Sequence, residues 1–74
     1  MTSTPGFSQR EIDLSEAARQ LELAVHDARV AYDCMGLGDL DAAHTHAVTA
    51  RTAVDAAETV LRASLAQQGN AGGQ

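Results

Sequence analysis

The residues best suited to chemistry lie in one stretch, "YDCMGLGDLDAAHTH", which runs from residue 32 to residue 46. It holds the single cysteine, Cys34, two of the three histidines, His44 and His46, and the carboxylate of Asp41. Thiolate, imidazole and carboxylate groups are common ligands of zinc, copper and iron. Side chains on one helix converge at spacings of three, four or seven, so Asp41 and His44 share a face while His44 and His46 do not. A metal-binding or metal-sensing helical bundle that uses these four residues is therefore an alternative hypothesis.

Our main expectation for the same stretch is a corner between two helices, with no metal site, cofactor or catalytic residue. Covalent catalysis needs a nucleophile, a base and an orienting acid inside a pocket, and two helices alone enclose none. A chain of 74 residues builds a core worth only about 3–5 kcal/mol unless a disulfide, a metal or a partner subunit assists. One cysteine cannot form an internal disulfide. We therefore expect a non-enzymatic protein that relies on a partner subunit.

The charge of the chain is acidic, at a formal −5, with five arginines and no lysine. Binding to nucleic-acid backbones needs a clustered basic surface, and these arginines are spread singly among acids. We therefore expect no direct nucleic-acid binding, and keep an acidic decoy of a nucleic-acid-binding protein as a lesser alternative. The sequence shows neither a signal-peptide pattern nor the roughly 18–20 apolar residues of a membrane span. The expected location is the cytoplasm, without membrane contact, and the composition is typical of a high-GC, actinobacterial-like genome.

The first helix is predicted to span residues 9–35, after a flexible leader and N-cap at 1–8. Ser8 and Glu11 have the spacing of a capping box, and Phe7 can pack on Ile12 across the cap. Apolar residues then recur at alternating intervals of four and three, which places them on one side of a helix. This stripe comprises Leu14, Ala18, Leu21, Val25, Ala28, Tyr32 and Met35.

The second helix is predicted to span residues 40–68, after a turn at 36–39 in which glycine can take a left-handed conformation. Asp39 or Asp41 can cap its first turn. Gly69 is expected to end it, leaving a flexible tail at 69–74. Its apolar stripe comprises Leu40, Ala43, Ala47, Ala50, Val54, Ala57, Leu61 and Leu65. So short a connection makes the helices antiparallel, and we expect the two stripes to face each other, with Leu21 near Val54.

The predicted fold is therefore an all-α, antiparallel two-helix hairpin, residues 9–68, that dimerises into a four-helix bundle. A closed two-fold dimer is the commonest way to complete such a core. The outer sides of the helices carry apolar residues where an exposed helix would be charged, and we predict that these form the interface. The predicted interface residues are Ile12, Leu23, Val30, Cys34, Ala53 and Val60. The expected function is a protein-protein interaction module, a regulator, adaptor or assembly factor, that binds itself and an unidentified protein.

Two resemblances concern the outline of the hairpin and the last residues. A pair of long helices joined by a short turn is similar to the small secreted helical-hairpin proteins of Gram-positive bacteria, which pair into four-helix bundles. Their turn carries Trp-x-Gly, whereas this turn reads Met35-Gly36-Leu37-Gly38. The terminal Gly72-Gly73-Gln74 resembles the end of Pup, the actinobacterial protein tag, but Pup is disordered and densely acidic. Neither resemblance extends over the chain, so the prediction stays with the hairpin.

Overall fold

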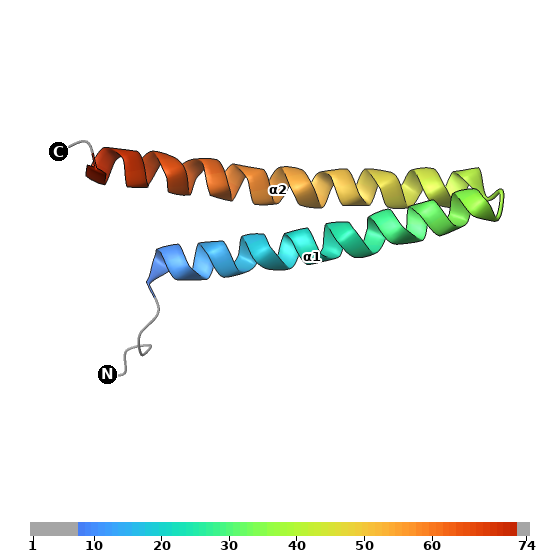
Figure 1. Ribbon diagram of the computed structural model, residues 1–74, viewed down its shortest axis with the longest axis horizontal. Helices are drawn as coiled ribbons and strands as arrows, with labels where there is room; N and C mark the ends of the chain where they lie inside the picture. The colour runs from blue at the N-terminus through green and yellow to red at the C-terminus, as the bar shows by residue number, and fades with distance from the viewer. Residues whose placement is uncertain (1–7, 73–74) are drawn as a thin grey trace.

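Two long helices lie side by side and antiparallel in the computed structural model, which describes the backbone of residues 8–72 (Figure 1). Helix α1 spans Gln9–Gly36 and helix α2 spans Leu40–Gly72. The predicted all-α, antiparallel two-helix hairpin is confirmed. The expected flexible leader and the contact between Phe7 and Ile12 involve residues outside the described part of the chain.

Helix α1 begins at the predicted capping box. The backbone N–H of Glu11 donates to Ser8 Oγ at 3.1 Å, and the backbone N–H of Ser8 donates to Glu11 Oε1 at 3.0 Å. These two bonds satisfy amide groups that have no partner within the first turn of a helix. The capping box therefore sets where α1 begins.

The turn satisfies the free carbonyls of α1 before α2 starts. Gly38 has φ +79°, a left-handed conformation that glycine adopts without steric cost. This conformation lets the N–H of Asp39 donate to the carbonyl of Cys34 at 2.9 Å, while the N–H of Gly38 donates to the carbonyl of Met35 at 3.0 Å. Asp39 then caps α2, because its Oδ1 accepts from the N–H of Ala42 at 3.1 Å. Of the two candidate caps, Asp39 is therefore the one used.

Helix α2 ends later than expected, because it continues through Gly69 to Gly72. Glycine closes a helix where it takes a left-handed φ, and among the described residues only Gly38 does so. With right-handed geometry, Gly69 costs about 1 kcal/mol relative to alanine and does not stop the helix. The segment expected to be a flexible tail thus begins inside α2, and residues 73–74 lie outside the described part.

The helices contact each other through alanine. The buried apolar residues are Ala17, Ala24, Ala31, Ala43, Ala53 and Ala57, which we call the alanine seam. The expectation that the two stripes face each other is wrong for α1, since Leu21 is 40% exposed and Tyr32 is 76% exposed, whereas Ala43 and Ala57 of the α2 stripe are buried as expected. The buried side of α1 lies one residue before its predicted stripe, a rotation of about 100°. Methyl side chains spaced seven apart let two backbones approach closely, which longer side chains would prevent.

The register along the hairpin is set by two cross-helix contacts. His46 Nδ1 lies 3.0 Å from Asp27 Oδ1, and at the open end Arg10 Nη2 donates to Gln68 Oε1 at 3.3 Å. Interpolation between these contacts brings Leu21 and Val54 to the same height, as expected. The helices are therefore in the predicted register but rotated about their own axes.

The turn geometry predicts opposite effects for its two glycines. Replacing Gly38 with alanine forces a Cβ into a left-handed conformation and should lower the free energy of unfolding by about 1–2 kcal/mol. Replacing Gly36 with alanine is the matched control, since the added Cβ would meet no atom within 4 Å and the φ of Gly36 is not left-handed. The control should be neutral or slightly stabilising. Urea denaturation followed by circular dichroism measures both, and equal effects would contradict the assignment of the turn.

The alanine seam predicts that a larger side chain placed in it lowers the stability of the hairpin. Ala57 is fully buried, so Ala57→Leu must separate the helices and should cost about 1–3 kcal/mol. The matched control is Ala66→Leu in the same helix, where the side chain is exposed and leucine is a good helix former. Thermal unfolding should show a clearly lower midpoint for Ala57→Leu alone. A midpoint unchanged from that of the control would show that the helices do not meet at Ala57.

Candidate functional site

Large apolar side chains gather on one side of the hairpin, and we call this surface the apolar face. Both helices are right-handed, and they run in opposite directions. In each helix, the residue that comes directly after a seam residue in the sequence therefore points to the same side of the hairpin. The members of the apolar face in α1 are Leu14, Leu21, Val25, Tyr32 and Met35, and its members in α2 are Leu40, Val54, Leu61 and Leu65. Their exposed fractions run from 38% at Leu14 to 76% at Tyr32. They are the large members of the predicted stripes, while Ala43 and Ala57 of the α2 stripe stay in the seam. On α2 the same side also carries His44, Arg51 and Glu58, which follow Ala43, Ala50 and Ala57 in the sequence.

The opposite side, which we call the threonine face, carries threonines together with the exposed apolar residues Ile12, Leu23 and Val48. A shallow groove between the helices is lined there by Gln20 and Leu23 from α1 and by Thr49, Thr52 and Ala56 from α2. Residues that precede the seam on both helices therefore share this side, which agrees with the placement of the apolar face. Thr49 and Thr59 donate their hydroxyls to carbonyls four residues earlier, at 3.1 and 3.0 Å.

The six residues predicted to form the interface are divided between the seam and the threonine side. Ala53 is 6% exposed and packs between the helices, while Val30, Cys34 and Val60 are half-buried. Ile12 and Leu23 are exposed, at 49% and 43%. As a contact with a second chain this set stays a prediction, but much of its surface is already used within the hairpin. The spacing of Ala17, Ala24 and Ala31 by seven residues is the sequence signal that would have located the seam on α1.

The histidines and carboxylates near the turn do not converge. Cys34 is half-buried on α1, Asp41 and His44 are exposed on α2, and His46 turns across the seam toward Asp27. A carboxylate accepts hydrogen bonds, so the His46 Nδ1 that faces Asp27 acts as the donor. Within residues 8–69 no three potential metal ligands of the types histidine, cysteine, aspartate and glutamate cluster. The bond between Asp27 and His46 was not foreseen, because its two partners come from different helices.

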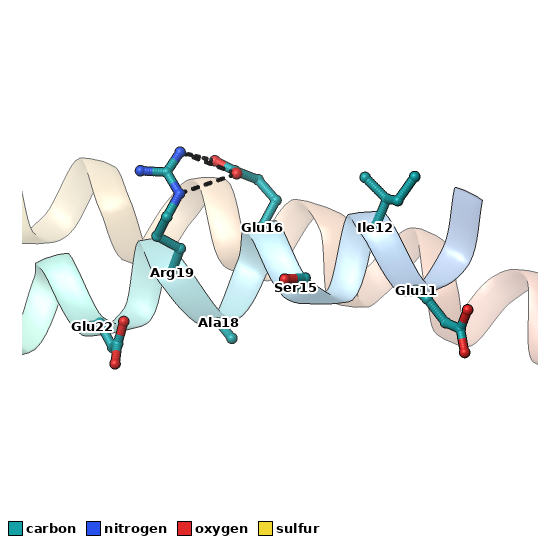
Figure 2. Close-up of a pocket in the computed structure, with 7 residues that line it drawn as sticks. All are labelled: Glu11, Ile12, Ser15, Glu16, Ala18, Arg19 and Glu22. Atoms are coloured by element: carbon teal, nitrogen blue, oxygen red, sulfur yellow. Dashed lines mark hydrogen bonds and ion pairs between the residues drawn. The ribbon is translucent and has the colours of Figure 1, made fainter. Parts of the chain in front are cut away.

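A shallow depression lies on the outer side of α1, and its lining comes from that single helix (Figure 2). Three carboxylates border it, from Glu11, Glu16 and Glu22, together with the hydroxyl of Ser15. Glu16 is turned to Arg19, whose Nη2 donates at 2.8 Å, while Glu11 and Glu22 point away from that pair. The other polar group that borders this depression is the guanidinium of Arg19.

Exposed ion pairs run along the outer edges of the hairpin. Hydrogen bonds from Gln20 and Arg19 lower the pKa of Glu16. The hydrogen bond from Arg62, at 2.9 Å, lowers the pKa of Glu58 and raises that of Arg62. Such exposed pairs contribute little to stability, because water screens them. They keep these parts of the surface charged at neutral pH, and Glu58, which follows Ala57, borders the apolar face on α2.

Neither helix, as far as residue 72, contains a segment long and apolar enough to cross a membrane. Comparison of the chain with protein-family models gave no match, and comparisons with curated proteins and with solved structures gave no significant similarity. The surfaces described above are therefore the basis for assigning a function.

Proposed function

We propose that this chain is a non-enzymatic, cytoplasmic protein-protein interaction module that assembles with a second copy of itself through the apolar face. The observation that supports this is the apolar face itself, whose large side chains from both helices are between 38% and 76% exposed. Monomeric proteins rarely leave a contiguous apolar surface of this kind in water, and such surfaces mark contacts with other proteins.

The weakness of the hairpin core also supports assembly. The buried apolar residues of the described chain are all alanines, and the hydrophobic contribution scales with the apolar area removed from water, at about 25 cal/mol per Å². A hairpin closed in this way needs a second source of burial. A partner that covers the apolar face supplies this additional burial, because the large apolar side chains are already exposed there.

The exposed area of the apolar face favours a second copy of the chain as its binding partner. A standard interface takes about 800 Å² from each partner, and the side chains of the apolar face together expose an area of that order. The same surface on both partners gives a closed two-fold dimer, which is a four-helix bundle. The threonine face of each hairpin then stays outside, where a further protein partner of this regulator, adaptor or assembly factor can bind.

The two alternative functions have less support. A metal-binding bundle requires converging ligands, and Asp41, His44 and His46 are directed to different surroundings. An acidic decoy requires a concentrated negative surface, whereas Glu16 and Glu58 are each paired with an arginine. The self-associating module is therefore the better proposal.

Two leucines of nearly equal exposure test the apolar face directly. Leu21 lies on the apolar face at 40% exposure, and Leu23 lies on the threonine side at 43% exposure. Leu21→Glu buries an unpaired charge in the proposed interface, which is strongly unfavourable, so the dimer should dissociate at least tenfold more readily. Leu23→Glu should leave the dimer intact. Sedimentation equilibrium over a dilution series measures both dissociation constants.

The pair of variants separates the competing interfaces. Loss of the dimer with Leu23→Glu but not with Leu21→Glu would favour the set that contains Ile12, Leu23 and Val30 and would overturn the apolar face. Circular dichroism at high protein concentration is the control that both variants remain helical.

A further inference from the structure

The apolar face has layers of unequal size along its length. The rows that point most directly out of this face are Leu14, Leu21, Ala28 and Met35 in α1, and Leu40, Ala47, Val54 and Leu61 in α2. By the register of the hairpin they pair into four layers. From the turn to the open end, the layers are Met35 with Leu40, Ala28 with Ala47, Leu21 with Val54, and Leu14 with Leu61. Three layers are large, and the second from the turn is small.

How well two such faces pack depends on whether the turns of the two hairpins lie at the same end or at opposite ends of the dimer. If both turns lie at the same end, the layer of Ala28 and Ala47 meets an identical layer, and four methyl groups leave a cavity. The layer of Leu21 and Val54 then meets its own copy, which brings four branched side chains together at the same spacing between hairpins. Protein interiors tolerate neither voids nor overpacking, and each costs on the order of 1–3 kcal/mol.

The opposite direction pairs small layers with large ones. If the turn of one hairpin lies beside the open end of the other, Ala28 and Ala47 meet Leu21 and Val54 of the second copy. The two end layers, Met35 with Leu40 and Leu14 with Leu61, also meet each other. Large side chains facing small ones fill such a core evenly, without changing the distance between the hairpins.

The outer rows of both helices also meet in this arrangement. In α2 this row holds His44, Arg51 and Glu58, so Arg51 meets Arg51 of the second copy near the axis, while Glu58 meets His44. The outer row of α1 favours the same arrangement. The midpoint between the two central layers falls at Ala24 and Val25 of α1, so Val25 meets Val25 of the second copy across the two-fold axis. Tyr32, 76% exposed, then lies at the height of Ala18 of the second copy, where a methyl group leaves room for an aromatic ring. Val25, which is 55% exposed in the single hairpin, is covered by its own counterpart.

We propose that two copies of this chain pack antiparallel through the apolar face, with the turn of each hairpin beside the open end of the other and Val25 at the two-fold axis. This inference rests on the proposed function, because it specifies the arrangement of the same dimer. In this arrangement Val25 contacts Val25 of the second copy. Leu21 and Val54 of each copy pack against Ala28 and Ala47 of the other.

Disulfide trapping tests the direction. In a Cys34→Ala background, Val25→Cys should form a covalent dimer under mild oxidation, because a disulfide requires Cβ atoms about 3.5–4.5 Å apart. The matched control is Glu22→Cys, which lies on the outer side of the same helix and should remain reduced. A mixture of separate Val25→Cys and Arg51→Cys chains detects the other direction, because Val25 would there face Arg51 of the second copy.

The outcomes distinguish the arrangement from the dimer itself. A Val25 to Val25 disulfide as the main product, identified by peptide mass, supports the antiparallel arrangement. A main product linking positions 25 and 51 overturns it and leaves the proposed dimer standing. No disulfide in either sample, from a chain whose molar mass is that of a dimer, also overturns it. A monomeric molar mass overturns both the arrangement and the proposed function.

Discussion

The close approach of two helices at the alanine seam is the constraint on which the rest of this structure depends. Ala17, Ala24 and Ala31 on α1 meet Ala43, Ala53 and Ala57 on α2. Close packing of helices requires small facing side chains, so most of the larger apolar side chains lie to one side, while Cys34, Val60 and the Asp27–His46 pair are half-buried beside the alanines. The seam thus decides which surfaces the hairpin presents, although it contributes little apolar burial itself.

The apolar and threonine faces follow from that constraint. Most of the large apolar side chains lie on the side that follows the seam, which on α2 also carries His44, Arg51 and Glu58. The side before the seam includes threonines that satisfy their hydroxyls within α2. The two sides of the hairpin therefore differ in chemistry while sharing the same backbone. In the proposed dimer, this asymmetry separates the surface for self-association from the surface that stays in water.

Local structure was largely predictable from the sequence, because its signals lie within a few residues of each other. The capping box of Ser8 and Glu11, the left-handed glycine in the turn and the antiparallel register were all predicted correctly. The end of α2 differed, since Gly69 is a helix breaker only in a left-handed conformation. Local propensity alone does not show which conformation a glycine will adopt.

The rotation of the helices could not be predicted in the same way. A stripe such as Leu14, Leu21 and Val25 shows which side of a helix requires burial, but it does not show whether the second helix or a second chain covers it. The contact between Asp27 and His46 was missed for a related reason, since it depends on which sides of α1 and α2 meet. These features are tertiary, and the spacing of alanines by seven was the available signal for them.

The most direct test of self-association through the apolar face is the molar mass of the unmodified chain by light scattering over a range of concentrations. The expected result is twice the chain mass of 7.7 kDa, with dissociation only on strong dilution. A monomer at high concentration, with the helices intact by circular dichroism, would contradict it, because the apolar face would then be stable in water without a second copy.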